Sequence, residues 1–219
     1  MIKYILSFIL DSDATFGRGD GVAGVVDAEV QHDEFGCPYL GGRSLKGLLV
    51  NECSEIWAAI PEEARPRWEK AAKRLFGVPG SGLDGGALMT FGDAQLPEDL
   101  RRAIAYDIGR KKIRREEVLD SITSLRRQTA IDETGVARKH SLRTMRVILR
   151  NTPFEAKLHF AEEPTKDDLA LLAACTKAFR RAGTGRNRGR GRLIAELKDS
   201  SGDCITEKYF KIFRKELIQ

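Results

Sequence analysis

Residues 154–197 read FEAKLHFAEEPTKDDLALLAACTKAFRRAGTGRNRGRGRLIAEL. Phe154–Phe160 alternates apolar and polar side chains, which predicts a strand with one buried face. Thr165 is a good N-cap for a helix over Lys166–Ala182, where apolar residues recur at helical spacing. After a run of glycine and arginine, Leu193–Leu197 predicts a final strand. This region therefore has the order strand, helix, strand.

The first half of the chain begins with a similar order. Ile2–Ile9 is rich in β-branched and aromatic residues and predicts a buried strand. Ser44 is a candidate N-cap for a helix over Leu45–Trp57, and a second helix is expected over Glu62–Leu75. Ala87–Asp93 again has the composition of a strand. The whole order predicts an α+β, ferredoxin-like fold.

Residues 101–150 interrupt this order with charged, irregular sequence that contains a turn at 132–135. They hold 14 Lys and Arg against 6 Asp and Glu, a net +8, whereas the remaining residues hold 23 against 26. We therefore expect one domain over 1–219, with 101–150 as a basic insertion. A polyanionic partner held by this insertion and a merely solvated insertion both explain the charge.

Composition excludes several classes of protein. The chain has 219 residues, a mass of 24.4 kDa and a mean hydropathy of −0.34, and no stretch approaches the ~20 apolar residues of a transmembrane helix. The N-terminal residues predict a strand, not a signal peptide. Four scattered cysteines lack the spacing of a zinc site and indicate free thiols in a reducing compartment. We expect a cytoplasmic protein.

The sequence GTGRNRGRGRL at 183–193 is the most informative motif. Glycine lets the backbone approach phosphates closely, and each arginine can fork onto phosphate oxygens. The motif follows a helix and lacks G-K-[ST], so it matches neither a Walker A loop nor a dinucleotide fingerprint. It predicts a phosphate-binding loop, with a flexible connector as the alternative. The predicted contacts are Arg186, Arg188, Arg190 and Arg192.

The sequence PYLGGRSLKGLL at 38–49 places a glycine pair before a helix. Helix N-termini favour anions, and Arg43, Ser44 and Lys46 in the first turn would add donors and charge. This pattern predicts a phosphate-binding corner, with an ordinary solvated helix start as the alternative.

A third motif, RRQTAIDETGVARKHSLRT at 126–144, lies inside the basic insertion. It fits a β-hairpin that turns at 132–135 and has basic flanks. A mobile loop is the alternative.

Together these motifs resemble the RAMP superfamily of CRISPR proteins. The shared features, in order, are a glycine-rich loop near the first strand, G-G-R-S-L-K-G, L-F-G at 75–77, F-G-D-A at 91–94 and the terminal G-T-G-R-N-R-G-R-G-R. The segment TAIDETGVA at 129–137 is similar to the thumb region of the backbone subunit of type III effector complexes.

The resemblance implies a core like that of RNA-recognition motifs and a subunit that forms a filament along a guide CRISPR RNA. The thumb would insert between guide and target RNA, with Ile131, Thr134 and Val136 in the wedge. Implied partners are guide RNA, target RNA, further copies of the chain and other subunits of a type III effector complex, with no membrane.

The resemblance also implies target RNA cleavage at regular intervals by an aspartate, with Mg²⁺ or Mn²⁺. The family pattern of glycine, hydrophobic residue and aspartate matches residues 24–27 and places the carboxylate at Asp27. The neighbouring Asp20, His32 and Asp33 are alternatives, and Asp27 is also a candidate turn cap. The chain departs from the family at Val50, where a basic residue is common, and in the more basic run GRKKIRREE at 109–117.

Two other functions remain open at this point. A metal-independent endoribonuclease that processes the precursor guide would need a histidine base, but His32, His140 and His159 have no evident partner set. A non-catalytic scaffold that binds only guide RNA would use the same phosphate contacts.

Overall fold

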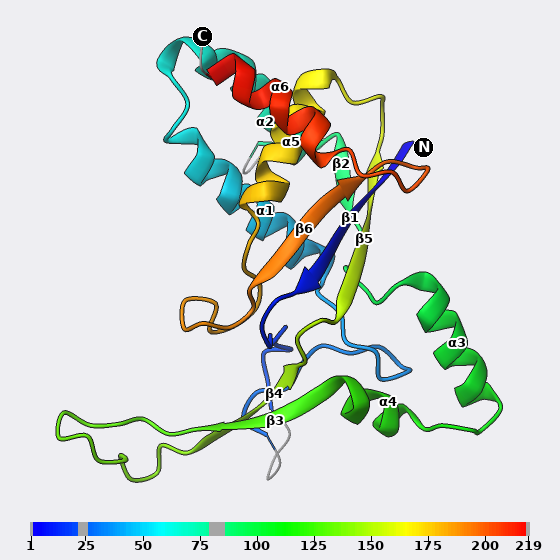
Figure 1. The fold of residues 1–219 in the computed structure, drawn as a ribbon, viewed down its shortest axis with the longest axis vertical. Helices are drawn as coiled ribbons and strands as arrows, with labels where there is room; N and C mark the ends of the chain where they lie inside the picture. The colour runs from blue at the N-terminus through cyan, green and yellow to red at the C-terminus, as the bar shows by residue number, and fades with distance from the viewer. Residues whose placement is uncertain (1, 22–25, 79–85, 218–219) are drawn as a thin grey trace.

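The computed structural model describes residues 2–21, 26–78 and 86–217 (Figure 1). Its elements, in chain order, are β1 (Ile2–Leu10), α1 (Gly42–Trp57), the 3-10 helix η1 (Glu62–Ala64), α2 (Arg65–Phe76), β2 (Met89–Phe91), α3 (Glu98–Gly109), α4 (Arg115–Ile122), β3 (Thr123–Gln128), β4 (Arg143–Ile148), β5 (Pro153–Phe160), α5 (Lys166–Ala178), β6 (Leu193–Lys198) and α6 (Thr206–Leu217).

The main sheet has four antiparallel strands in the order β2-β5-β1-β6. The two central strands, β1 and β5, come from opposite halves of the chain and pair from Ile2 opposite Phe160 to Ile9 opposite Pro153. Helices α1 and α2 connect β1 to β2, and α5 connects β5 to β6. The predicted ferredoxin-like fold is therefore confirmed.

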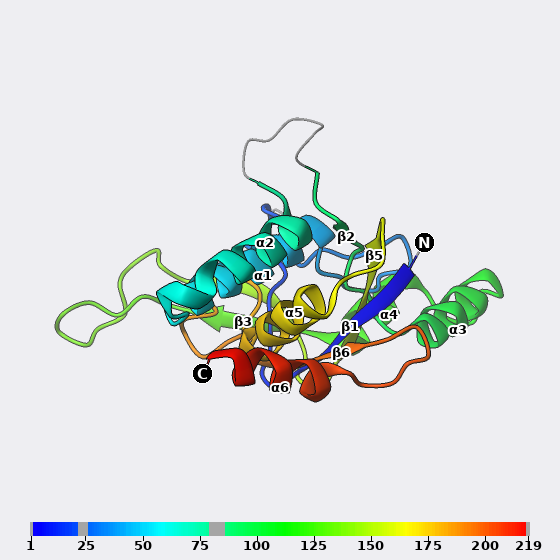
Figure 2. The same ribbon diagram turned by 90° about the horizontal axis from the view of Figure 1, so that it is seen from above.

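The core lies between this sheet and the four helices α1, α2, α5 and α6, which cover the same face (Figure 2). Strand alternation directs Leu6, Phe8 and Leu10 of β1 into it, because successive side chains of a strand point to opposite faces. The rings of Phe8 and Phe154 stack with their centroids 5.2 Å apart. Helix α5 is buried almost all round, as expected for the central helix of this layer.

Residues 98–148 form a second part of the molecule at one end of the sheet. Strands β3 and β4 make a separate antiparallel hairpin that projects away from the core, and α3 and α4 precede it (Figure 1). The sequence after residue 101 predicted irregular structure. This prediction is wrong for α3 and α4, which are regular helices. Helix α3 has no buried residue, so its sequence has only a weak apolar stripe.

Two predicted helix ends also differ from the structure. Ser44 is not an N-cap: α1 begins at Gly42, whose N–H donates to the carboxylate of Asp93 at 2.7 Å. The helix expected to reach residue 182 ends at Ala178, because residues 180–182 leave it to pair with residues 191–193. The N-cap at Thr165 is confirmed, since its hydroxyl accepts from the N–H of Asp168.

The C-terminal helix α6 has no counterpart in the sequence prediction. It packs against α5 and adds Phe213 to the core, where the ring lies 4.7 Å from that of Trp68 between centroids. Among the helices described, none has the length and apolar composition needed to cross a membrane.

Candidate nucleic-acid interface

The tip of the β3–β4 hairpin is ordered by one carboxylate. Oδ1 of Asp132 accepts hydrogen bonds from the N–H and hydroxyl of Thr134 and from the N–H of Val136, at 2.7 to 3.0 Å. These bonds, led by the Thr134 hydroxyl, hold the pKa of Asp132 below its usual value. Gly135 completes the turn at φ +82°. The predicted hairpin turn is therefore confirmed.

The three residues predicted for the wedge lie at this tip and are all exposed. Ile131 and Val136 leave 67% and 60% of their surface accessible, which is unusual for large apolar side chains. Thr134 lies between them in sequence, with its hydroxyl bonded to Asp132. The tip thus presents apolar surface to the solvent, as a contact with nucleobases or protein requires.

The stem of the hairpin is basic on both strands. Arg126 forms an ion pair with Asp13, with 2.9 Å between Nη2 and the carboxylate oxygen. Four further cations on the hairpin are exposed and have no ion-pair partner among the described residues: Arg127, Arg138, Lys139 and Arg143. Unpaired surface cations of this kind favour a polyanionic ligand.

The glycine-arginine loop, residues 183–192, is closed at its neck by backbone hydrogen bonds. The N–H of Ala182 donates to the carbonyl of Gly191, and the N–H groups of Gly191 and Thr184 donate to the carbonyls of Asp13 and Thr15, each at 2.9 Å. Gly191 has φ +65°, and a Cβ there would lie 1.9 Å from the Ala182 carbonyl oxygen. Only glycine fits at this position of the neck, so Gly191 has a structural cause.

The four predicted arginines of this loop have different surroundings. Arg188 is exposed, and Arg190 donates to Sδ of Met145 on β4. Arg192 pairs with Asp11 at 3.5 Å. Arg186 lines a polar cavity of about 550 Å³ with Glu52 of α1. Burial and the neighbouring Glu55 carboxylate raise the pKa of Glu52, and the charges of Arg186 and Arg180 oppose that shift.

A cavity of about 740 Å³ separates the hairpin stem from the glycine-arginine loop; we call it the junction cavity. Its charged lining is Asp11, Asp13, Arg126, Arg150, Arg190 and Arg192. Four arginines face two aspartates, so the cavity carries a net positive charge. The predicted site does not include Arg126 or Arg150. Nothing in the sequence indicates that these two residues, on β3 and after β4, lie close to the glycine-arginine loop.

Asp27 lies beside β4, where Thr144 pairs with Arg127 near the outer end of the β3–β4 ladder. Its N–H donates to the carbonyl of Thr144 at 2.7 Å, and its Oδ2 accepts from the N–H of Thr144 at 2.6 Å. Ala28 forms a parallel bridge with Met145, the residue that Arg190 contacts. Asp27 is exposed, and its Oδ1 has no hydrogen-bond partner among the residues described. Gly24 and Val25 of the predicted motif lie outside the described residues.

The other acidic candidates near Asp27 are occupied by local contacts. Asp20 pairs with Arg18 at 2.6 Å, and this hydrogen bond lowers the pKa of Asp20. Oδ1 of Asp33 accepts from the N–H groups of Phe35 and Cys37, both at 2.9 Å, which makes it a turn residue. Asp27 differs from these two in that its partner, Thr144, lies on β4 next to Met145, which Arg190 contacts.

The start of α1 holds Arg43 and Ser44 exposed and Lys46 half-buried. None of these side chains has an ion-pair partner among the described residues. One of the N–H groups of the first turn, that of Gly42, is already bonded to Asp93, so fewer of them are available to an anion. The prediction of a phosphate contact at these three residues stays open.

The basic run at 109–117 is largely neutralised by its own neighbours. Lys112 pairs with Asp107, Arg114 with Glu117, and Arg115 with Glu116. Arg110 stacks on the ring of Tyr106 and donates to its hydroxyl. This run therefore has less charge available for RNA than its sequence indicates.

The three histidines lie on separate elements. His32 is in the loop before α1, His140 lies between β3 and β4, and His159 is on β5; the hairpin tip lies far from the sheet (Figure 1). Nδ1 of His159 is buried without a hydrogen-bond partner. The structure does not bring these side chains together. No group of three or more His, Cys, Asp or Glu suited to a metal ion occurs within residues 2–21, 26–78 and 86–217.

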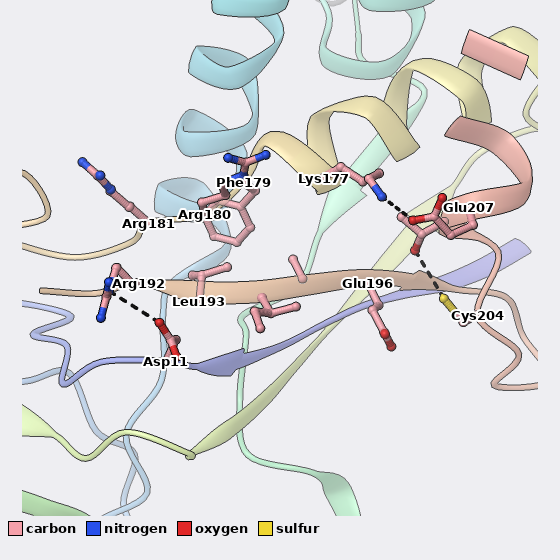
Figure 3. A pocket seen from close by; sticks show the side chains of 13 residues that line it. Asp11, Lys177, Phe179, Arg180, Arg181, Arg192, Leu193, Glu196, Cys204 and Glu207 are labelled. Carbon is pink, nitrogen blue, oxygen red and sulfur yellow. Dashed lines mark hydrogen bonds and ion pairs between the residues drawn. The ribbon is translucent and has the colours of Figure 1, made fainter. Parts of the chain in front are cut away.

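A second cavity of about 440 Å³ adjoins the junction cavity, and both are lined by Asp11 and Arg192 (Figure 3). At its far end Lys177 pairs with Glu207. Arg180 and Arg181 project from the end of α5 without an acidic partner in the described chain. The cavity extends the basic surface away from Asp27 and contains no predicted catalytic residue.

The comparisons with known proteins agree with this architecture. The chain matches the family model of the RAMP superfamily over residues 10–194. It is similar in structure to a chain of a type III-B Cmr-beta complex bound to cognate target RNA, with a TM-score of 0.62, 14% identity, and 96% of this chain and 99% of that chain covered. It is also similar to a chain of the apo state of type III-B Cmr-beta, with a TM-score of 0.59, 15% identity, and 90% of this chain and 97% of that chain covered. No curated protein matches the sequence significantly.

At these identities the structural likeness establishes a shared fold and nothing finer. The family match covers residues 10–194, which is most of the chain, and the antiparallel sheet is consistent with the ferredoxin-like fold expected of that family. The chain belongs to the RAMP superfamily.

Proposed function

We propose that this chain is a guide-RNA-binding backbone subunit of a type III CRISPR interference complex, and that it cleaves complementary target RNA at Asp27. One observation carries the proposal: Asp27, the hairpin and the glycine-arginine loop meet on adjacent residues of β4. Thr144 bonds Asp27, and Met145 contacts both Ala28 and Arg190. The residue that bonds the candidate carboxylate is thus adjacent on β4 to the residue that contacts Arg190, and Arg190 lines the basic junction cavity. The similar chains from Cmr-beta structures, one bound to target RNA, support this assignment.

Guide binding in this proposal is electrostatic and independent of sequence. Arginines of the loop and hairpin contact phosphates, and base pairing between guide and target supplies the specificity. The exposed apolar tip of the hairpin inserts into the duplex of guide and target. Copies of the chain assemble along the guide as a filament. Arg43, Ser44 and Lys46 contribute further phosphate contacts.

The proposed cleavage requires a group that acts on the ribose 2′-OH or on a metal ion. The free Oδ1 of Asp27 fits a Mg²⁺ or Mn²⁺ site of the kind that uses one carboxylate together with RNA phosphates and water. When bound, such an ion would stabilise charge on the phosphate. Asp27 would hold the ion or orient the 2′-OH, and the Thr144 N–H keeps the carboxylate in one position.

The guide-binding part is tested by native purification of the protein and sequencing of any RNA that accompanies it. A uniform small RNA with a constant tag and a variable remainder is expected. Heterogeneous RNA, or none, would contradict the proposal and favour a processing enzyme or a general RNA-binding protein.

The cleavage part is tested with Asp27→Asn in the assembled complex. Asparagine keeps an oxygen for the Thr144 N–H and removes the charge, so the loop should keep its conformation. We expect target cleavage to disappear while guide binding persists; Asp20→Ala is the control and should cut normally. Cleavage in EDTA would instead favour a histidine enzyme, and no cleavage with any divalent ion would favour a scaffold.

A further inference from the structure

We propose that Arg146 is a positioning residue, which couples the hairpin to Asp27 and so sets where the carboxylate lies relative to the target strand. This inference rests on the proposed function of Asp27. It concerns a guanidinium at the base of the hairpin that contacts neither the junction cavity nor the hairpin tip.

Arg146 joins three parts of the chain through one side chain. Its Nε lies 3.0 Å from Oε1 of Glu29, and its Nη1 donates to Oδ1 of Asp120 at 2.9 Å and to the hydroxyl of Thr123 at 3.0 Å. Asp120 and Thr123 belong to the end of α4 and the start of β3. The side chain thus ties both hairpin strands and α4 to the segment that carries Asp27.

Glu29 is the acidic end of this connection and is buried. Its side chain is 4% exposed and that of Arg146 13%. The only other hydrogen bond to the Glu29 carboxylate within the described chain comes from the N–H of Val30. A buried carboxylate needs a cation and several donors, so Glu29 depends on Arg146. The pair is 117 residues apart in sequence, which makes it a long-range tie rather than a local turn contact.

The backbone around this pair leaves Asp27 little freedom. The N–H of Arg146 donates to the carbonyl of Ala28 at 3.0 Å, and Ala28 forms a parallel bridge with Met145 of β4. On the other side, the N–H of Arg18 donates to the carbonyl of Glu29 at 3.0 Å. A Cβ on Gly21 would lie 2.2 Å from the carbonyl oxygen of Val26, so the two backbones are in close contact.

The consequence is that a movement of the hairpin base moves Asp27 with it. When the hairpin inserts between guide and target RNA, the Arg146–Glu29 pair keeps the carboxylate in position relative to the target strand. Without the guanidinium, residues 27–29 are held only by their backbone bonds and by the bond from the Thr144 N–H to the Asp27 carboxylate. A misplacement of about 1 Å costs on the order of 10²-fold in rate.

The test uses the assembled complex with Arg146→Ala and single-turnover cleavage at saturating target. We expect the cleavage rate to fall on the order of 10²-fold, with guide content and target affinity unchanged within about twofold. Arg146→Lys should recover part of the rate, because an ammonium reaches one or two of the three acceptors but not all. Added guanidinium should restore part of the activity of the alanine variant.

Asp120→Ala is the matched control, because it removes the exposed partner of Arg146 and leaves the pair with Glu29 intact. Its rate should fall less than about threefold, in the range of a surface ion pair. Hydrogen exchange supplies a readout apart from activity: the amides of Asp27 and Thr144 should lose protection in Arg146→Ala but not in Asp120→Ala.

If Arg146→Ala does not assemble, Glu29→Gln/Arg146→Met removes both charges at once and takes its place. Normal cleavage and normal amide protection in these variants, with Asp27→Asn inactive, would overturn the inference and leave the proposed function standing. If Asp27→Asn still cuts, the proposed catalytic role fails, and the exchange data alone decide whether Arg146 anchors the segment.

Discussion

The glycine-arginine loop should account for a measurable share of the salt dependence of RNA binding. Arg186, Arg188 and Arg190 have no ion-pair partner among the described residues, so each can neutralise one phosphate. For single-stranded nucleic acid each such contact contributes about 0.7 to the slope of log K against log salt. Replacing all three by alanine should therefore reduce the slope by about 2.

The same relation gives the loss of affinity. If these contacts contribute nothing at about 1 M salt, three of them strengthen binding about 50-fold at about 0.15 M, or roughly 2 kcal/mol. The measurement is fluorescence anisotropy of labelled single-stranded RNA with the full chain, between about 0.05 and about 0.5 M KCl.

The control carries the same change of net charge elsewhere. Arg102, Arg114 and Arg115 each pair with a nearby glutamate on the α3–α4 region, and their triple replacement by alanine should change the slope by less than about 0.7. Equal slopes for the two triple variants would refute a local contact, because only total charge would matter. An unchanged slope in the loop variant would refute the loop as a phosphate site.

Three further predictions concern the supporting structure. Gly191→Ala places a Cβ 1.9 Å from the Ala182 carbonyl oxygen and should lower the free energy of unfolding, measured in urea, by about 2–3 kcal/mol or more. Gly189→Ala has nothing within 4 Å of its Cβ and should lower that free energy by only about 1 kcal/mol, because of its positive φ. Equal losses in the two variants would refute the packing argument. Cys204 is exposed and should be the one thiol that reacts with a disulfide reagent in the native chain at about pH 8. Burial raises the pKa of Cys37 to about 11, and the remaining two thiols are buried. Fast reaction of two or more thiols would contradict this prediction. The hydrogen bonds of Asp132 lower the pKa of its carboxyl, so the tip gains stability above the usual carboxyl pKa of about 4 and loses it as the pH falls through the lowered value. The Val136 amide resonance should therefore shift at a pH below the usual carboxyl pKa and should not titrate in Asp132→Asn.

The elements that the sequence predicted correctly are those whose causes are local. Alternation defines β5, a threonine three residues before an aspartate caps α5, and Asp132 with Gly135 makes a turn without outside help. Each of these depends on residues within a few positions of one another. The turn at the tip of the hairpin could be predicted for this reason.

The features that sequence patterns missed depend on distant residues. The start of α1 is fixed by Asp93, 51 positions after Gly42, and the place of Asp27 by Thr144, 117 positions later. Helix α3 buries no residue, so its sequence lacks the apolar stripe from which a helix could be predicted. Arg150 lines the junction cavity because the residues after β4 lie close to the glycine-arginine loop in the folded chain.

The closed neck of the glycine-arginine loop has a consequence for how this chain can be altered. Because backbone bonds to residues 13 and 15 fix both ends, the span between Gly185 and Gly189 is anchored whatever its length. Doubling a flexible loop of this kind costs only about 0.6 kcal/mol. The arginine tip is therefore an exchangeable module: residues can be inserted, or a reporter group attached, at Asn187 without unfolding the strands that carry it.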